Sequence, residues 1–236
     1  MKISRIRYKK AQVAELKHYS KFLPVDIETI KKEIQPYQQK FMENFGIFLR
    51  DLKGKNVLEI GPALTGTAYI DAWLFDNISI KNIVGIDPLM FLHPRHIPIN
   101  NNKHYILGMG ENLPFHSEIF DLIICINVLD HMFLPSKALN EMYRCLKNYG
   151  TLLISVNCFN PLFKPLFPLF SLLDRPHPHH FTKEDLLGMI QKHGFQIQKI
   201  YEEPRKYKEK NKNIKRYIAN YLGVKHVIIR AKKVSR

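Results

Sequence analysis

The pattern of hydrophobic and polar positions changes near residue 52. Residues 1–51 are polar, with helical spacing over Ile27–Gln35 and Gln39–Leu49, breaks at Pro24 and Pro36, and no strand-like run. From Asn56 onward, short β-rich runs alternate with helical stretches, which is typical of a parallel sheet with crossover helices. We therefore predict an N-terminal helical cap (residues 1–51) followed by an α/β domain (residues 52–236).

Seven short runs are strand candidates. They are Asn56–Gly61, Asn82–Asp87, His104–Leu107, Phe120–Ile126, Thr151–Val156, Phe195–Tyr201 and Lys225–Lys232. The clearest helix is Ser136–Leu146, where Ala138, Leu139 and Met142 recur on one face. This order predicts a seven-stranded, mostly parallel sheet.

An irregular segment, residues 157–181, follows the fifth predicted strand as an insert. Its apolar part, Pro161–Leu173, is rich in proline, so we expect neither a continuous helix nor a central strand there. Three interpretations remain open: a mobile cover over a binding pocket, a surface that enters lipid, and core packing.

The charge of the chain favours anionic partners without choosing among them. The formal net charge is +15, with five basic residues in Met1–Lys10 and seven in Arg205–Arg216. Nucleic acid, an anionic lipid surface or an acidic substrate would fit this charge, and so would a solvated basic surface.

The three cysteines, Cys125, Cys145 and Cys158, lack CxxC spacing, and the first two fall in apolar patterns. They indicate a reducing compartment. The N-terminus lacks the long apolar stretch of a signal peptide, so we expect a cytoplasmic protein.

Distinctive residues cluster where the predicted strands end. Glu59 closes the first strand and is followed by Gly61, Ala63 and Gly66 in a turn toward a helix. Such a turn lets a ligand approach the backbone and offers the free N–H groups of a helix start. Asp87 and Pro88 end the second strand, where a carboxylate can accept both hydroxyls of a ribose.

Two longer motifs follow at the ends of the next predicted strands. One is Leu107–Phe115, read LGMGENLPF, and the other is Phe120–His131, read FDLIICINVLDH. Ligands of open α/β sheets bind outside the carboxyl ends of the strands, where all these residues are expected to meet.

In combination these motifs resemble the class I S-adenosylmethionine-dependent methyltransferases, in particular the ubiquinone/menaquinone-type and related small-molecule enzymes. The resemblance covers residues 56–201. It includes the step Lys147–Ser155 and the late segment Phe181–Leu187 followed by His193-Gly194-Phe195. It implies a Rossmann-like α/β fold and S-adenosyl-L-methionine (AdoMet) as the cofactor.

The resemblance also implies site residues. Glu59 and the Gly61–Gly66 turn would hold the methionine part of AdoMet, and Asp87 would take the ribose hydroxyls, with Pro88 or Leu89 against the adenine. The backbone of Gly110 and Glu111 would face the adenine edge, and Asn127 would lie under the sulfonium. Two positions depart from the family pattern: Ala63 replaces a glycine, and Met109 replaces the usual aspartate.

Methyl transfer needs positioning above all, and needs a base only if the acceptor loses a proton. His131 and Asp130 are the catalytic candidates, although a histidine at a helix start can also be purely structural. Three more histidines, His177, His179 and His180, are spaced irregularly around Pro178. We expect them to line the acceptor pocket and expect no metal.

The sequence thus predicts a methyltransferase acting on a small-molecule or glycolipid-like acceptor. One alternative is an RNA methyltransferase that uses the basic patches. Another is a non-catalytic AdoMet-fold binding protein, which the departures at Ala63 and Met109 keep open. The sequence does not indicate the oligomeric state.

Overall fold

The computed structural model describes residues 3–19, 27–62, 69, 80–89, 103–204 and 223–234. Two of the predicted cofactor residues, Ala63 and Gly66, lie outside these residues, as does the basic patch Arg205–Arg216.

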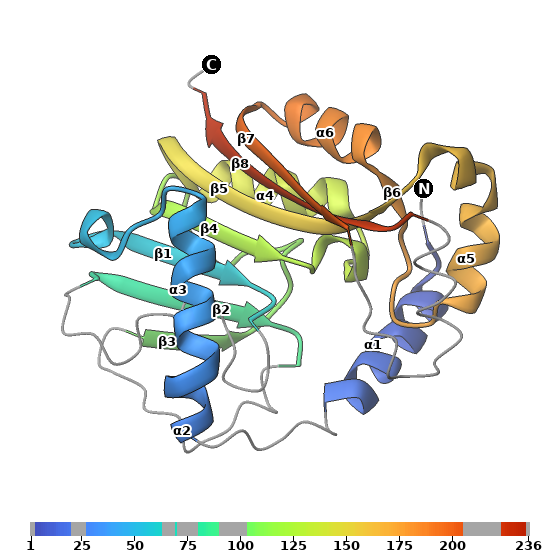
Figure 1. Cartoon of the computed structure of the whole chain (residues 1–236), viewed down its shortest axis with the longest axis horizontal. Coiled ribbons are helices and arrows are strands. Elements are labelled where there is room, and N and C mark those ends of the chain that lie inside the picture. The colour runs from blue at the N-terminus through green and yellow to red at the C-terminus, as the bar shows by residue number, and fades with distance from the viewer. Residues whose placement is uncertain are drawn as a thin grey trace.

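A single twisted sheet organises the described chain (Figure 1). Its strand order is β3-β2-β1-β4-β5-β8-β7, and a two-residue strand, β6, pairs with β5. The strands are β1 (Asn56–Ile60), β2 (Asn82–Asp87), β3 (Lys103–Leu107), β4 (Phe120–Ile126), β5 (Leu146–Phe159), β6 (Phe181–Thr182), β7 (Phe195–Pro204) and β8 (Lys225–Lys233). The seven predicted strands are confirmed, and so is the Rossmann-like α/β class with a mostly parallel sheet.

The register of the parallel strands decides where the site lies. Ile60 pairs with Ile86, and Asp87 pairs with Leu107, so β1, β2 and β3 end level with one another. The long fifth strand pairs antiparallel with β8, which in turn pairs antiparallel with β7. The carboxyl ends of β1, β2 and β4 therefore form one edge, as the predicted ligand site requires.

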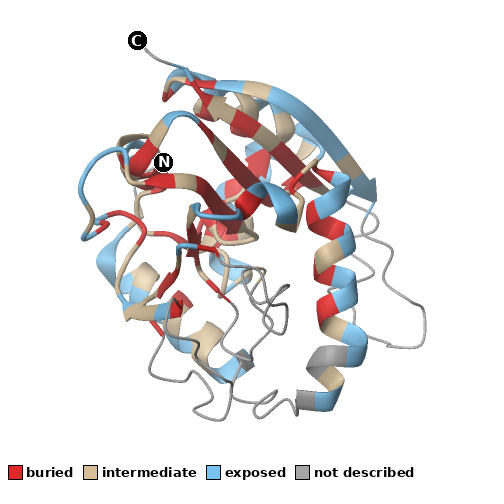
Figure 2. Ribbon diagram, turned by 90° about the vertical axis from the view of Figure 1, so that its left-hand side faces the viewer, coloured by how far each residue is buried: buried red, intermediate tan, exposed pale blue. Residues whose placement is uncertain are grey.

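Helices cover both faces of the sheet. Helix α3 (Gln35–Asn44) buries Phe41 and Met42, and Phe45 follows directly after it, in a core that includes Leu153 and Ile228. Helices α4 (Pro135–Cys145) and α6 (Lys183–Lys192) bury their apolar faces on the other side. Figure 2 shows these buried stripes along helices whose outer faces are exposed. Because α3 shares a core with the sheet, the N-terminal segment is packed against it.

The predicted break at Pro36 is wrong. The chain runs without interruption from α2 (Ile27–Thr29) through a π-helical turn, η1 (Ile30–Ile34), into α3. Proline lacks an N–H and crowds the carbonyl four residues earlier, which disfavours an ordinary α-helical interior. A wider π turn directly before Pro36 relieves that conflict. Helix α3 ends at Asn44, and a 3-10 helix, η2 (Leu49–Leu52), follows.

The insert is also more regular than its prolines suggest. A 3-10 helix, η6 (Pro161–Leu166), leads into α5 (Phe167–Leu173). Pro161 and Pro168 lie in the first turns of these helices, where the missing N–H needs no partner. The outer face is apolar and exposed, with Leu162 78%, Leu172 74% and Leu173 65% accessible.

Helix α1 (Arg5–Tyr19) lies beside α5, beyond the carboxyl ends of the strands (Figure 1). Arg7 joins the two elements, since its guanidinium donates to the carbonyls of Ser171, Asp174, Arg175 and His177. No helix within the described ranges is long and apolar enough to cross a membrane.

Candidate functional site

A cavity of about 1000 Å³ opens at the carboxyl ends of the strands. Its volume is at the upper end of the range of roughly 300–1,000 Å³ for small-molecule sites, which leaves room for a cofactor and an acceptor together. Of the predicted site residues that the structure describes, eight line it: Glu59, Gly61, Asp87, Pro88, Gly110, Glu111, Asn127 and His131. The predicted site is therefore a single space, with Asp130 behind its wall.

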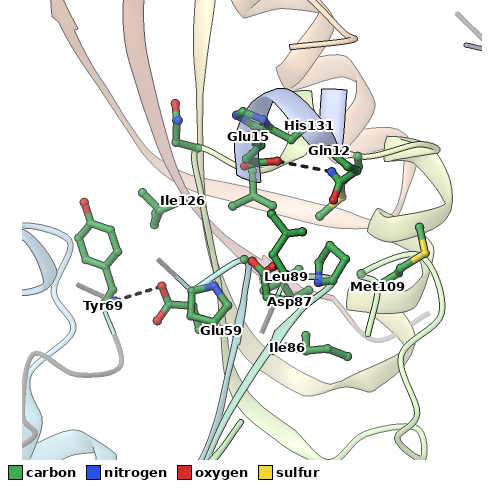
Figure 3. A pocket seen from close by; sticks show the side chains of 18 of the residues that line it. Gln12, Glu15, Glu59, Tyr69, Ile86, Asp87, Leu89, Met109, Ile126 and His131 are labelled. Atoms are coloured by element: carbon green, nitrogen blue, oxygen red, sulfur yellow. Dashed lines mark hydrogen bonds and ion pairs between the residues drawn. The ribbon is translucent and has the colours of Figure 1, made fainter. Parts of the chain in front are cut away.

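Glu59 is a buried carboxylate at the end of β1. Glu59 is only 2% exposed, and its Oε1 accepts a hydrogen bond of 3.0 Å from the backbone N–H of Tyr69. A buried carboxylate held in this way is a fixed negative group, suited to the ammonium group of an amino acid. Figure 3 shows Glu59 and Tyr69 joined at one side of the cavity.

Gly61 begins the turn after β1 with a φ of +71°. An added Cβ would lie 2.4 Å from Cγ2 of Val128, so the position has no room for a side chain. The backbone N–H of Gly61 donates to the carbonyl of Ile86 at 2.9 Å, which fixes the turn against β2. Glycine is thus required here by the local fold.

Asp87 ends β2 with its carboxylate toward the cavity. Oδ1 accepts from the backbone N–H of Leu89 at 2.6 Å, so Oδ2 is left for a ligand hydroxyl. Burial raises the pKa of Asp87 to about 6, and the bond from Leu89 opposes that rise. Bound hydroxyls would therefore stabilise an ionised group that the empty cavity disfavours.

Glu111 has a side-chain role that the sequence did not reveal. Its Oε1 accepts from the backbone N–H groups of Phe133 and Leu134, at 2.6 and 3.1 Å, directly before α4. The carboxylate therefore anchors the start of α4, and the backbone of Gly110 and Glu111 is the part predicted to face the cofactor. Met109, which departs from the family pattern, also lines the cavity.

Asn127 follows β4 in a left-handed conformation with φ +57°. Its backbone N–H donates to the carbonyl of Ser155 at 2.9 Å, and its Oδ1 accepts from Asn157 at 2.6 Å. Asparagine tolerates this conformation better than most residues do. The strand thus turns sharply at the floor of the cavity.

The opposite wall comes from the N-terminal helices and was missed by the sequence analysis. Tyr8, Gln12 and Glu15 of α1 line the cavity, as do Tyr37 and Gln38 of α3. The spacing i, i+4 and i+7 of the three α1 residues places them on one helix face, but the spacing does not indicate what that face contacts. Gln12 donates to Glu15 at 3.4 Å (Figure 3).

His131 lies in the 3-10 helix η5 (Leu129–His131), at the α1 side of the cavity. Its Nδ1 is 3.4 Å from Oε1 of Glu15, and its Nε2 is 3.9 Å from Oδ1 of Asp130. Burial raises the pKa of Glu15 to about 8 and lowers that of His131 to about 4. Figure 3 shows Gln12, Glu15 and His131 together, separated from Glu59 and Asp87 at the strand ends.

None of His177, His179 and His180 borders the cavity, so their expected place in the acceptor pocket stays a prediction. The segment after α5 folds behind η5, where the backbone N–H of His179 donates to the carbonyl of Asp130 at 3.2 Å. His177 Nδ1 lies 2.8 Å from Asp174 Oδ2. This hydrogen bond opposes the effect of burial on the imidazole and raises the pKa of His177 to about 9. Nor does the segment Pro161–Leu173 border the cavity in this structure, so a mobile cover formed by this segment stays a prediction.

Comparison with known proteins agrees with the motifs. The methyltransferase domain family matches residues 58–154. A tRNA U34 carboxymethyltransferase of Campylobacter hominis is 33% identical, over 52% of this chain and 44% of that protein. A ubiquinone/menaquinone biosynthesis C-methyltransferase of Vibrio vulnificus is 31% identical, over 44% of this chain and 48% of that protein. The chain spans less than half the length of these relatives.

Solved structures with the same fold include enzymes of different activity. A geranyl diphosphate methyltransferase in complex with GPP and sinefungin has a TM-score of 0.63 at 13% identity, over 84% of this chain and 77% of that one. The cyclase SpnF has a TM-score of 0.60 at 14% identity, over 84% and 81%. At such identities the likeness concerns the fold alone. The motifs and the family match are what favour AdoMet as the cofactor. Together, the strand-end motifs, the sheet order and the family match support a methyltransferase domain over residues 58–154 within a fold of the class I methyltransferase type.

Proposed function

We propose that the protein binds AdoMet at the strand ends and transfers its methyl group to a small-molecule acceptor held against α1. The observation that carries this proposal is the division of one cavity into two walls. Glu59, Asp87 and Asn127 form the strand-end wall, and Tyr8, Gln12 and Glu15 form the helical wall.

The strand-end wall fits AdoMet by its chemistry. The molecule carries an ammonium group and two ribose hydroxyls, for which the buried carboxylates of Glu59 and Asp87 are suitable partners. Gly61 also lines the cavity, and without a side chain of its own it leaves its backbone open to a ligand there. When bound, AdoMet supplies an activated methyl group, and the protein has to orient an acceptor toward it.

The helical wall suits an acceptor with an apolar body and at least one polar group. Tyr8, Ile34, Tyr37 and Met132 contribute apolar surface, and Gln12, Glu15 and His131 contribute polar groups. The relative in Vibrio vulnificus, by its name, acts in ubiquinone/menaquinone biosynthesis, so an aromatic or prenylated acceptor is the class that we favour.

We propose that His131 contacts the acceptor and that Asp130 positions the His131 ring. His131 lines the cavity, whereas Asp130 is only 3% exposed and lies behind it. Replacing His131 should then lower kcat by a larger factor than it raises the Kd for AdoMet.

The experiment is calorimetry with AdoMet, followed by a screen for transfer of a labelled methyl group to lipid, RNA and small-molecule fractions of a cell extract. We expect AdoMet binding that is lost in Asp87→Ala, and label in the lipid or small-molecule fraction. A folded protein without AdoMet affinity would instead support a non-catalytic binding protein.

RNA is a second candidate acceptor. The relative in Campylobacter hominis is, by its name, a tRNA-modifying enzyme, and the net charge of +15 would favour a polyanion. Label in the RNA fraction, together with RNA binding that weakens steeply with salt, would support this candidate over the first.

A further inference from the structure

Behind His131 lies a cluster of potential metal ligands from two distant parts of the chain. Asp130 and His131 belong to η5, and His177 follows α5, 46 residues later in sequence than His131. One ligand atom from each of the three lies within 4.8 Å of the others. We propose that Asp130, His131 and His177 bind a transition-metal dication of the Zn²⁺ type.

The orientation of His177 supports this proposal. His177 Nδ1 is engaged with Asp174 Oδ2 at 2.8 Å, which leaves Nε2 for an ion. Histidine ligands commonly pair their second nitrogen with a carboxylate in this way, which fixes the tautomer and makes the ligand more basic. His131 Nε2 lies 3.9 Å from Asp130 Oδ1, and an ion bound there would replace the hydrogen bond that the His131 ring makes with the backbone of Pro176.

A buried oxygen without a partner points into the same cluster. Oδ1 of Asp130 is inaccessible and accepts no hydrogen bond from the described residues, and the Asp130 side chain is only 5% exposed. Nδ1 of His131 is likewise buried and has no hydrogen bond within the described part of the chain. An unpaired buried carboxylate oxygen is costly, and metal coordination is one of the few ways to stabilise it.

The ligand set and its dimensions select the ion. Two imidazoles and one carboxylate suit Zn²⁺, Co²⁺ or Mn²⁺, whereas Mg²⁺ and Ca²⁺ prefer oxygen ligands. Ligand atoms of a tetrahedral Zn²⁺ are about 3.4 Å apart, from bond lengths of roughly 2.1 Å. The distance of 3.9 Å between His131 Nε2 and Asp130 Oδ1 needs only a small side-chain adjustment to reach that value.

The ion would connect three elements at the acceptor wall. Its ligands join η5 to the segment after α5, and Glu15 of α1 supports one of them from the other side. Three protein ligands leave one position of a tetrahedral ion open.

The test is a titration of the full-length, chelator-treated protein with Zn²⁺ in a competing chelator, repeated with Co²⁺ to record its visible spectrum. We expect one tightly bound equivalent and the intense absorption of a tetrahedral Co²⁺ site. His177→Ala and Asp130→Asn should weaken binding by at least 100-fold. Asp174→Asn should weaken it by about 10- to 100-fold, because it removes only the carboxylate that orients His177.

Two matched controls separate a specific site from adventitious binding. His104 and His116 are exposed histidines away from the cluster, so His104→Ala and His116→Ala should bind as the wild type does. Melting temperature and AdoMet affinity establish that each variant is folded. The proposal is overturned if the wild type binds no saturable equivalent, or if folded His177→Ala and Asp130→Asn bind like the controls.

Metal binding is measured without AdoMet or acceptor, so the two proposals fail independently. Absence of Zn²⁺ binding in a protein that binds AdoMet refutes the metal site alone. Zn²⁺ binding in a protein without AdoMet affinity refutes the proposed methyl transfer alone.

Discussion

At the scale of single residues, the cavity keeps groups that the fold alone would not favour. Asp87 is a buried carboxylate with a raised pKa, and Gly61 and Asn127 have positive φ values. Such features lower the stability of a fold, and proteins retain them at binding sites where ligand binding needs them. Substitution of Asp87 should therefore separate binding from folding, whereas substitution of Gly61 should affect both.

Asp87→Asn is expected to weaken AdoMet binding and to stabilise the ligand-free protein. The pKa of about 6 exceeds that of an unfolded aspartate, so the folded protein holds the extra proton between about pH 4 and pH 6. Stability from this group is present at low pH and is lost as the pH rises through 6. At pH 7.5 the free energy of unfolding should rise by about 1–3 kcal/mol in the variant, with little change at pH 4.5.

Urea unfolding at the two pH values measures that difference, and calorimetry measures AdoMet affinity. The loss of charge-assisted hydrogen bonds to ribose should reduce affinity by roughly 1.5–3 kcal/mol. Wild-type affinity in the folded variant would show that Asp87 does not hold the ribose.

Gly61→Ala is expected to destabilise the fold as well as the cofactor site, because the new Cβ would meet the Val128 side chain at 2.4 Å and φ is +71°. The cost should be about 1–3 kcal/mol. Adding Val128→Ala should recover part of that stability in thermal unfolding, since it removes the two closest methyl groups. If the double variant were as unstable as the sum of the single ones, the clash would not be the cause.

At the scale of elements, the sequence predicted what depends on local pattern. All seven main strands follow from short apolar runs, and α4 follows from the spacing of Ala138, Leu139 and Met142. The strand-end residues Glu59, Asp87 and Asn127 meet in one cavity because the parallel register, implied by the βα alternation, brings those ends together. The predicted division between cap and domain at residue 52 stays a prediction.

What the sequence did not predict depends on packing between distant segments. Pro36 reads as a break, yet a π turn accommodates it once α3 is packed on the sheet. The face of α1 with Tyr8, Gln12 and Glu15 becomes a cavity wall through tertiary contacts alone. Likewise, no local spacing joins His177 to Asp130 and His131.

Arg7 is the residue that holds α1 against α5, so its loss should separate these elements. Its guanidinium donates four hydrogen bonds to carbonyls, among them those of Ser171 and Asp174 at the end of α5. Arginine suits this position because its planar donors point in fixed directions and its charge favours a helix C-terminus.

Arg7→Ala should lower the free energy of unfolding by roughly 1.5–3 kcal/mol, and Arg7→Lys should recover only part of it. Chemical denaturation is the measurement, and Arg5→Ala, at an exposed position on the same helix, is the matched control. Equal effects of Arg5→Ala and Arg7→Ala would contradict the proposed clamp.

At the scale of the whole molecule, the cavity connects the N-terminal helices with the sheet that carries the cofactor residues. A ligand that fills it contacts both, so its binding energy opposes any opening of α1 away from the sheet. The insert η6–α5, whose residues do not border the cavity, should not feel the ligand directly. The segment whose amides exchange more slowly when the ligand is bound is therefore the segment that closes the site.

Hydrogen exchange with and without AdoMet together with the acceptor found in the labelling screen measures this coupling, because AdoMet alone is proposed to contact only the strand-end wall. At a ligand concentration of 100 Kd, openings that break the site become less favourable by about 2.7 kcal/mol, so amides of residues 8–15 in α1 should exchange up to about 100-fold more slowly. Amides of residues 161–173 should change little. Asp87→Asn at the same AdoMet concentration is the control, because weaker binding should remove most of the protection from an otherwise intact α1. Strong protection of residues 161–173, with none in α1, would contradict the wall assigned here and would make the insert the element that covers the acceptor.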